Sequence, residues 1–285
     1  MKIKASGDRP LRKEEHMKII AVMIPKGGSG KTTTADSLGY ILGEEQSKKV
    51  LMIEGDEQGD TSKTFGCYEP EGVGTAELIE KHISLGGEYR TTDLIRPTPY
   101  QHIDIIPGNG YLRQTDIKLS RDKSTDQVHR VKQALEEIKG AYDYCICDCG
   151  RLVDMVVLNM IMAADLIIVP VKVGGFEIEA LQNLNEQVEE LRLINKNIKL
   201  KGLMVMRQKN KTSLDTEEWL KTSSGHDMFV TPVRRTIVAE RASMSFEPLP
   251  RFSRRCIAAQ DYRNVVFELM KEMGDRSFKV EDRRR

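Results

Sequence analysis

The segment Pro25-Lys26-Gly27-Gly28-Ser29-Gly30-Lys31-Thr32-Thr33 decides the fold, because it has the composition of a phosphate-binding loop. Its end, Gly30-Lys31-Thr32, matches the last positions of the general pattern G-x-x-x-x-G-K-[ST]. Glycines adopt positive φ readily and leave backbone N–H groups open to a phosphate, and a following helix N-terminus adds partial positive charge. The segment therefore predicts a nucleotide site in which Lys31 reaches the β- and γ-phosphates and Thr32 binds Mg²⁺.

The sequence on either side provides the strand and the helix that such a loop requires. Lys18 to Ile24 is an apolar, β-branched run that ends at a proline, which is typical of a buried parallel strand. Thr32 to Leu42 lacks proline and places Ala35, Leu38 and Leu42 at helical spacing. This order of strand, loop and helix favours a phosphate loop over a glycine-rich turn without a ligand.

The run from Lys26 to Thr33 resembles the deviant Walker A loop, KGGxGKT, of the ParA/MinD family of P-loop ATPases, and is closest to the ParA-type partition ATPases. In that family the extra lysine crosses a dimer interface and touches the partner's nucleotide. The resemblance implies this catalytic role for Lys26 and a homodimer that forms on ATP binding. It also implies ATP and Mg²⁺ as ligands, with phosphate contacts from Gly27, Gly28, Ser29, Gly30, Lys31, Thr32 and Thr33.

A second acidic segment follows the next predicted strand, Lys49 to Glu54. It resembles the family's D-x-D-P-Q-G-N motif at three positions and departs from it at three others. The matching residues are Asp56, Gln58 and Gly59, and the departures are Glu54, Glu57 and Asp60. A carboxylate at this end of a strand can orient an attacking water or hold a water bound to Mg²⁺. We therefore predict Asp56 as a catalytic and metal-site residue, with Glu54 as its helper, and a solvated acidic turn as the alternative.

Tyr142 to Asp148 predicts a third strand that ends in a carboxylate. It resembles the Walker B motif, which implies that Asp148 holds Mg²⁺ through water. The family usually continues with D-T-P-P, whereas this chain reads Asp148-Cys149-Gly150-Arg151. The second switch therefore departs from the family pattern. Asn159 matches the family's usual asparagine in the helix that follows.

Two later runs, Leu166 to Val171 and Lys201 to Met206, predict a fourth and a fifth strand, and a helix is expected to start at Phe176 to Leu181. In the resembling family the nucleotide base lies near the end of the fifth strand and near the loop before the last helices. The resemblance therefore makes Arg207 and Pro232 candidates for the base pocket. An ordinary loop arginine and loop proline are the alternative.

The 285-residue chain alternates strands with helices and contains no Pro/Gly/Ser linker, which predicts an α/β protein. We expect a P-loop NTPase with a doubly wound, mostly parallel sheet flanked by helices. Residues 17–273 are predicted to form one ParA-like ATPase domain, with a flexible arm at 1–16 and a charged tail at 274–285. The sequence contains no run of about 18 apolar residues, and residues 1–16 are polar and charged, unlike a signal peptide. We therefore expect a cytoplasmic protein.

Three of the five cysteines, Cys145, Cys147 and Cys149, alternate along the third predicted strand. This period places all three on one face of the strand. Thiolate ligands of zinc usually come from C-x₂₋₄-C turns instead. We therefore predict small buried hydrophobic side chains, with a metal or redox role as the alternative.

The net charge of +1 conceals a basic C-terminal part, because residues 201–285 hold 18 Lys/Arg and 12 Asp/Glu. Six arginines fall between Arg234 and Arg255, opposed by Glu240 and Glu247 only. Arginines at this density suit the phosphates of nucleic acid, which they bind through charge and not base sequence. Non-specific DNA contact is predicted for Arg234, Arg235, Arg251, Arg254 and Arg255, with solvated arginines and internal ion pairs as the alternative.

The last predicted helix, Arg255 to Met273, carries an apolar stripe that indicates packing onto the core. The tail after it has Phe278 and Val280 as its large apolar residues, too little area for stable anchoring at a membrane surface. We therefore expect no membrane partner. The Asp261-Tyr262 pair within this helix resembles the end of the family's C-terminal segment.

Together the motifs resemble a ParA-type ATPase that drives partition of a plasmid, a mobile element or a chromosome. The resemblance implies a nucleotide-sandwich dimer that binds DNA non-specifically on the nucleoid, and a ParB-like centromere-binding protein that stimulates slow ATP hydrolysis. Three alternatives share the scaffold. They are a cargo-positioning ATPase, a biosynthetic amidoligase or dethiobiotin-synthetase-like enzyme, and a redox or iron–sulfur carrier.

Overall fold

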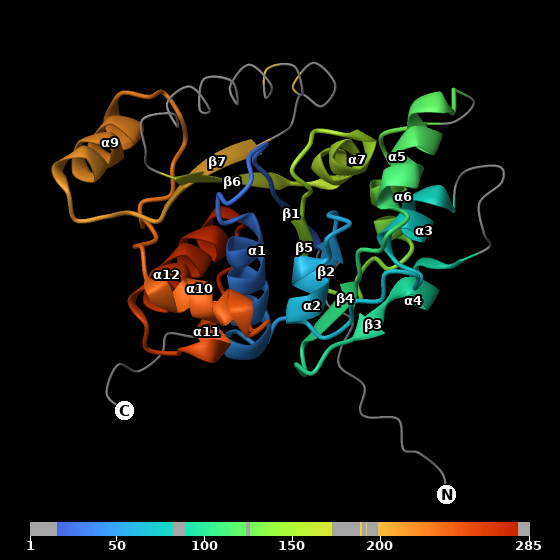
Figure 1. Cartoon of the computed structure of the whole chain (residues 1–285), viewed down its shortest axis with the longest axis horizontal. Coiled ribbons are helices and arrows are strands. Elements are labelled where there is room, and N and C mark those ends of the chain that lie inside the picture. The colour runs from blue at the N-terminus through green and yellow to red at the C-terminus, as the bar shows by residue number, and fades with distance from the viewer. Residues whose placement is uncertain are drawn as a thin grey trace, which may run out of the picture.

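The computed structural model of the chain describes residues 16–81, 89–123, 126–172, 189, 192 and 199–278. Within them the strands are β1 (Lys18–Val22), β2 (Val50–Glu54), β3 (Arg96–Pro97), β4 (Ile103–Ile106), β5 (Tyr144–Asp148), β6 (Leu166–Lys172) and β7 (Lys199–Val205). They form one sheet in the order β3-β4-β2-β5-β1-β6-β7 (Figure 1). Only β3 and β4 pair antiparallel among these neighbours. The predicted mostly parallel sheet is therefore confirmed.

The five predicted strands correspond to β1, β2, β5, β6 and β7, with ends that differ by one or two residues. No strand was predicted for β3 and β4, which lie toward one edge of the sheet. Their lengths of two and four residues are too short to show a strand pattern. Pro97 fits in β3 because an edge strand needs no donor on its outer side.

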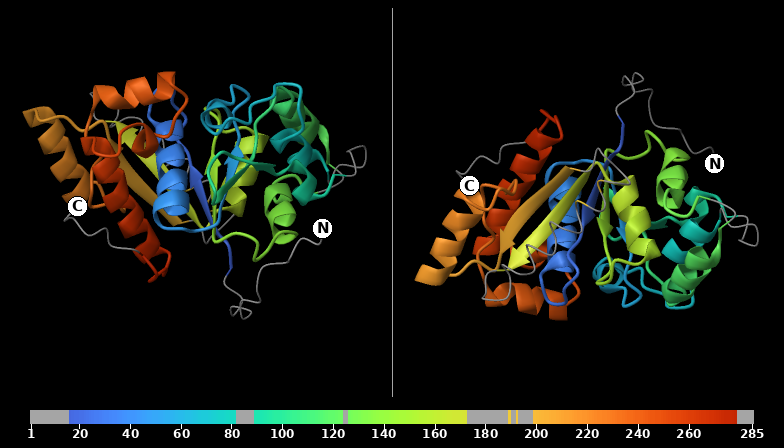
Figure 2. Two further views of the ribbon diagram at one scale, coloured as in Figure 1. Left: turned by 90° about the horizontal axis from the view of Figure 1, so that it is seen from below. Right: turned by 90° about the horizontal axis from the view of Figure 1, so that it is seen from above.

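Helices cover both faces of the sheet, as Figure 2 shows from two directions. The helices are α1 (Lys31–Tyr40), α2 (Asp60–Thr64), α3 (Thr75–Glu80), α4 (Thr91–Leu94), α5 (Leu112–Arg121), α6 (Arg130–Glu136), α7 (Met155–Ala163), α9 (Lys211–Thr222), α10 (Ile237–Met244), α11 (Leu249–Phe252) and α12 (Ile257–Glu272). A π-helix, η1 (Ile41–Glu45), continues α1 beyond the predicted end of that helix. The helix expected at Phe176 to Leu181 lies outside the described residues.

Successive residues of β1 point into two different cores, which explains why this strand is apolar throughout. Ala21 packs in a cluster with residues of α3, α5, α6 and α7. Ile20 and Val22 pack in a second cluster with residues of α1 and α12. Because both faces of the central strands are covered, the fold is the predicted doubly wound α/β arrangement.

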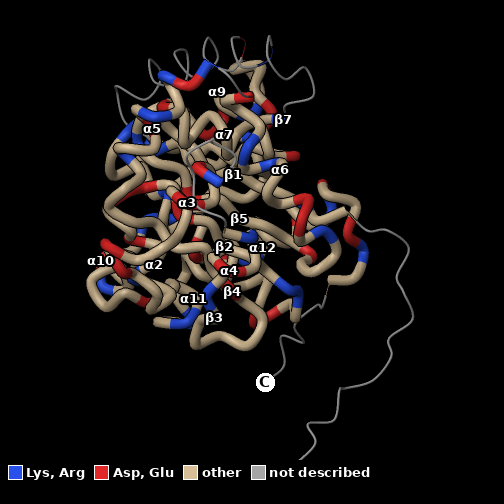
Figure 3. The backbone as a smooth tube through the Cα atoms, turned by 90° about the vertical axis from the view of Figure 1, so that its right-hand side faces the viewer, with Lys and Arg blue, Asp and Glu red and all other residues tan. Residues whose placement is uncertain are grey.

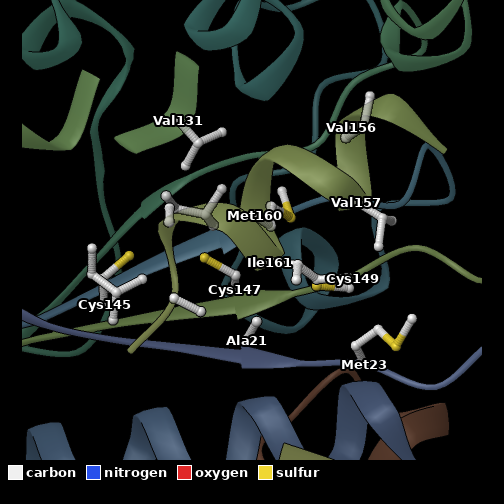
Figure 4. Close-up of a cluster of buried hydrophobic side chains, with 14 of the residues drawn as sticks. Ala21, Met23, Val131, Cys145, Cys147, Cys149, Val156, Val157, Met160 and Ile161 are labelled. Carbon is white, nitrogen blue, oxygen red and sulfur yellow. The ribbon is translucent and has the colours of Figure 1, made fainter. Parts of the chain in front are cut away.

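The three alternating cysteines are buried free thiols in the core that faces α7 (Figure 4). Cys145 and Cys147 are fully buried on β5, and Cys149 follows directly after the strand. In Figure 4 they lie on the same side as Met160 and Ile161 of α7. The prediction of small buried hydrophobic side chains is thus confirmed. Burial raises the pKa of Cys149 well above its ordinary value, which opposes thiolate chemistry.

The apolar stripe of α12 packs against the sheet as predicted, since Tyr262, Val265 and Leu269 are buried. The chain after α12 then turns to the amino edge of the sheet. There Asp275 accepts hydrogen bonds from Lys48 Nζ at 2.5 Å and Tyr144 Oη at 2.9 Å. The start of the predicted tail is therefore attached to β5 and to the residues before β2. Among the described residues, no helix combines the length and the apolarity needed to span a membrane.

Candidate nucleotide-binding site

The loops that follow β1, β2 and β5 meet at the carboxyl edge of the sheet (Figure 1). After β1 the chain crosses β5 to reach β2, and after β5 it crosses back over β1 to reach β6. The two connections therefore run in opposite directions along the sheet. Ligands of open α/β sheets bind outside the carboxyl ends of the strands at such a switch point. The glycine-rich loop therefore stands where this architecture places ligands.

The loop between β1 and α1 depends on two glycines in left-handed conformations. Gly28 has φ 67°, and Gly30 has φ 84° and is the N-cap of α1. Other residue types adopt this region only with strain. The first backbone N–H groups of α1 have no acceptor in a preceding turn, so the end of the loop offers donors for an anion.

Lys31 is almost buried inside the loop. Its side chain donates a hydrogen bond from Nζ to the Lys26 carbonyl at 3.1 Å, and Ser29 Oγ donates to the same carbonyl at 3.0 Å. Burial lowers the pKa of Lys31, while the negative charges of Asp148 and Asp56 oppose that shift. The ammonium group is therefore held within the loop, whereas Lys26 itself is exposed.

Thr32 and Asp148 form the centre of the site. Thr32 Oγ1 donates to Asp148 Oδ2 at 2.8 Å, although the two residues are 116 positions apart. Asp148 Oδ1 is buried and accepts no hydrogen bond from the described residues. A buried carboxylate oxygen without a partner is unfavourable, and oxygen atoms are the ligands that Mg²⁺ prefers. The residues present thus fit a Mg²⁺ ion. Burial raises the pKa of Asp148 to about 6.

Two residues that the sequence analysis missed extend this centre. Thr61 Oγ1 lies 2.9 Å from Asp148 Oδ2 and 2.8 Å from Asp36 Oδ1. Burial, followed by the charge of Asp148, raises the pKa of Asp36 well above its ordinary value. A protonated Asp36 can donate to Thr61 while the single hydroxyl proton of Thr61 goes to Asp148. Position in the motif could have suggested Thr61, but a carboxyl group inside α1 carries no sequence signal.

Asp56 and Glu54 differ sharply in exposure. Asp56 is partly buried, and its Oδ1 accepts from Gln58 N–H at 3.0 Å. Glu54 is fully buried and accepts from the backbone N–H of Ser62 at 3.0 Å and of Asp56 at 3.3 Å. Burial raises the pKa of Glu54 well above its ordinary value. Glu54 therefore shapes the turn that carries Asp56, and Asp56 is the carboxylate that can reach a ligand.

A cavity of about 290 Å³ opens beside the loop, between the end of β7 and α10. Gly30 and Thr33 line it on one side, and Met206, Gln208 and Val233 line it on the other. The predicted base-pocket residues Arg207 and Pro232 are not among its lining residues. Arg207 Nε instead donates a hydrogen bond to Glu217 Oε2 at 3.0 Å. Met206 and Gln208 thus line the cavity, whereas the Arg207 side chain is turned toward Glu217 of α9.

The predicted DNA-contacting arginines fall into two groups. Arg235, Arg251, Arg254 and Arg255 are exposed. Arg234 is partly buried, and its guanidinium forms two bonds with the buried Asp261 carboxylate, one of them from Nε at 2.8 Å, as in the alternative of an internal ion pair. A buried carboxylate binds an adjacent guanidinium strongly. Figure 3 marks acidic as well as basic residues along this part of the chain, although basic residues outnumber acidic ones there.

Other residues that carried the family resemblance hold elements together. Tyr262 Oη lies 2.9 Å from Thr34 Oγ1, which links α12 to α1 directly behind the loop. Asn159 is buried and accepts from Arg130 N–H at 2.9 Å, which links α7 to α6. These contacts position the loop and the layers around it.

Comparison with known proteins supports the same assignment. The profile of the AAA_31 family, described as an AAA domain, matches residues 17–201. The chromosome partitioning protein ParA of Caulobacter vibrioides is 26% identical over 269 residues, which cover 93% of this chain and 98% of that protein. The sporulation initiation inhibitor protein Soj of Bacillus subtilis is 27% identical and covers 88% of this chain and 98% of its own length.

Solved structures share the fold at lower identity. The structure of apo McdA from Cyanothece superposes with a TM-score of 0.77 at 22% identity and covers 89% of this chain and 100% of that one. Because the family profile spans well over half of the chain, the protein belongs to the AAA_31 family of AAA domains, as an ATPase with a ParA-like P-loop.

Proposed function

We propose that the protein is a ParA-type ATPase that binds Mg-ATP, dimerises around it and moves DNA through cycles of non-specific DNA binding. One observation carries the proposal. The two-lysine glycine loop lies beside a Thr32–Asp148 pair whose second carboxylate oxygen is buried without a partner among the described residues. ATP and Mg²⁺ together would supply the anion and the cation that this arrangement lacks.

Each residue of the site has a distinct task in this proposal. The loop N–H groups and Lys31 bind the β- and γ-phosphates, and Thr32 and Asp148 hold Mg²⁺, which neutralises phosphate charge when bound. Asp56 orients the attacking water. The water oxygen bonds to the γ-phosphorus, the bond to the bridging oxygen breaks, and ADP leaves with that electron pair. The water proton passes to the released phosphate or to solvent.

The exposed position of Lys26 supports its action on a second subunit. Its neighbour Lys31 is buried in the loop, whereas Lys26 stands at the outer surface of the same loop. A lysine so placed can stabilise charge on the partner's nucleotide, as an arginine finger does in other P-loop enzymes. We treat residues 17–273 as one domain, since the strands between Lys18 and Val205 share one sheet and α12 packs in the same core as β1 and β7.

The exposed arginines before α10, within α11 and between α11 and α12 support contact with DNA phosphates. Arg235, Arg251, Arg254 and Arg255 contribute there, whereas the ion pair of Arg234 with Asp261 gives that residue a structural task. Such binding is independent of base sequence and weakens with salt. A ParB-like protein would stimulate hydrolysis on the nucleoid and release the dimer. The same biochemistry would also serve a cargo-positioning ATPase.

A biosynthetic ATPase remains the second candidate, because one neighbour in fold is such an enzyme. Cobyrinic acid a,c-diamide synthase from Mycobacterium smegmatis, solved with an ATP analogue and magnesium, superposes with a TM-score of 0.75 at 21% identity and covers 93% of this chain and 99% of that one. Phosphate release can be measured with ATP alone, with DNA and with a panel of small carboxylates. DNA-dependent turnover supports the partition ATPase, whereas turnover that requires a carboxylate and ignores DNA contradicts it.

A further inference from the structure

The segment after β5 is held rigidly against the segment after β2. Gly55 N–H donates to the Asp148 carbonyl at 2.9 Å, which extends the strand pairing by one residue. A Cβ on Gly150 would lie 3.0 Å from the Gly55 carbonyl oxygen, so the two backbones are in close contact there. Farther along, Asp154 caps α7 by accepting from Val157 N–H at 2.9 Å. Arg151 therefore projects from a segment fixed at both ends.

The side chain of Arg151 lies across the entrance of the phosphate site. Its Nε is 3.6 Å from Asp56 Oδ2. Its Cδ is 3.9 Å from the point where a Cβ on Gly27 would stand, so the same side chain also reaches the glycine loop. The guanidinium therefore adds a cationic group beside the loop to those of Lys26 and Lys31.

The contact between Arg151 and Asp56 is weak enough to be exchanged. The Arg151 side chain is 58% exposed, and the separation of 3.6 Å exceeds that of a direct hydrogen bond. Exposed ion pairs of this kind contribute little. A γ-phosphate carries more charge than one carboxylate and presents several oxygens to the planar guanidinium, which binds phosphates in bidentate fashion.

We propose that Arg151 is a phosphate-binding residue supplied in cis, which leaves Asp56 for the γ-phosphate when ATP binds. This inference rests on the proposed function, because it assigns a residue to the same nucleotide site. The exchange releases Asp56 Oδ2 to accept a hydrogen bond from the attacking water. ADP has no γ-phosphate, so Arg151 stays on Asp56 in the ADP state. The Cys149-Gly150-Arg151 switch thus distinguishes ATP from ADP within one subunit, independently of Lys26 from a partner.

The test uses the full chain with Arg151→Ala and, in parallel, Arg151→Gln, which retains most of the side-chain length. Arg113→Ala on α5 is the control, because it removes an exposed arginine outside the site. Affinities for a non-hydrolysable ATP analogue and for ADP are measured with Mg²⁺, together with kcat. We expect both Arg151 variants to lose about tenfold or more in analogue affinity relative to ADP affinity. Their kcat falls as well, and the control keeps wild-type values.

The ratio of the two affinities separates this inference from a purely structural role. Wild-type ADP affinity in the variants shows that the site is folded, and a reduced analogue-to-ADP ratio then supports the inference. An unchanged ratio, or a higher kcat in the variants, overturns it, because Arg151 would then only restrain Asp56. Failure of the wild-type protein to bind either nucleotide contradicts the proposed function itself. If the wild type binds both nucleotides and the variants bind them equally well, only the inference about Arg151 is contradicted.

Discussion

At the scale of single residues, the two lysines of the loop stand in contrasting environments. Lys31 is buried and bound to a loop carbonyl, as a group that stays with its own nucleotide should be. Lys26 is exposed on the same loop. The family resemblance implied a division of work between them, and their difference in burial is consistent with that prediction.

Replacing Lys26 by Ala should abolish ATP-dependent dimerisation or partner-stimulated hydrolysis. ATP binding by the monomer should stay nearly intact, because the Lys26 carbonyl that holds Lys31 belongs to the backbone. Sedimentation velocity with a non-hydrolysable analogue measures the dimer, and exposed Lys139→Ala is the matched control. An undiminished dimer with normal turnover would remove the action on a partner subunit.

The chemistry of the loop could be predicted from residue types, but the contacts of its neighbours could not. Thr32 and Asp148 were both predicted to hold Mg²⁺, and their side chains are in direct contact. Thr61 and Asp36 escaped prediction because their importance comes from a contact across 25 positions between α1 and α2. The ion pair of Arg234 could not be foreseen either, since its partner, Asp261, is 27 positions away in the sequence.

At the scale of elements, the C-terminal helices and the loops between them carry several arginines, and these arginines differ in their contacts. Arg234 connects the loop before α10 to α12 through Asp261. Arg254 and Arg255 lie exposed between α11 and α12. The first arginine thus contributes to the packing of these elements, and the other two are exposed to solvent.

The double variant Arg254→Ala/Arg255→Ala should weaken DNA binding equally for all sequences in the presence of the ATP analogue. Removal of two phosphate contacts makes the negative slope of log K against log salt shallower by about 2. Titration of fluorescent duplexes at several salt concentrations measures both effects. Arg113→Ala/Arg121→Ala on α5 is the matched control. Unaltered affinity and slope would show that these arginines do not contact the phosphates.

Element prediction was reliable where the pattern was long and buried, and poor where it was short. The central strands are apolar on both faces, so β1, β2, β5, β6 and β7 were recognised from their composition. The edge strand β3 and its neighbour β4 are defined by pairing with each other and, for β4, with β2, which residue composition does not encode.

At the scale of the whole molecule, the end of the described chain closes the amino edge of the sheet. Asp275 is bound by Lys48 and Tyr144, and Lys18 Nζ lies 3.7 Å away. Burial alone would raise the pKa of Asp275, but the hydrogen bonds from Lys48 and Ser277 hold it well below its usual range. The carboxylate therefore stabilises the fold as an anion.

Asp275→Asn should lower the free energy of unfolding by about 3 kcal/mol at neutral pH, because it leaves Lys48 buried without its charged partner. The folded pKa lies below the unfolded one, so the stabilisation is complete above about pH 4 and is lost as the pH falls below that value. Urea unfolding at about pH 7 and about pH 3 should show the gap between variant and wild type narrowing in acid.

Asp227→Asn provides the matched control for that comparison. Asp227 pairs with Lys201 at 3.2 Å, but its side chain is 61% exposed. Exposed pairs contribute at most about 1 kcal/mol, so this variant should stay close to the wild type. Equal destabilisation by the two variants, or a gap for Asp275→Asn that does not depend on pH, contradicts the role of the buried ion pair.

The arrangement of the whole molecule followed from the sequence to a large degree. Alternating strands and helices predicted the doubly wound sheet, and the strand ends predicted which loops would meet. The cavity beside the glycine loop could not be predicted in detail, since its lining comes from the loop, the end of β7 and α10 together. Met206, with φ 54°, enters it through a backbone conformation that no pattern indicates.

The central claim is that the glycine loop and Asp148 form a Mg-ATP site, and equilibrium binding of ATP with and without Mg²⁺ tests it most directly. The wild-type protein should bind ATP more tightly with Mg²⁺, and Lys31→Ala should lose at least about tenfold in affinity, the worth of a charged hydrogen bond. A Lys31→Ala protein that binds ATP as tightly as the wild type, with Mg²⁺ having no effect on either, would contradict the account.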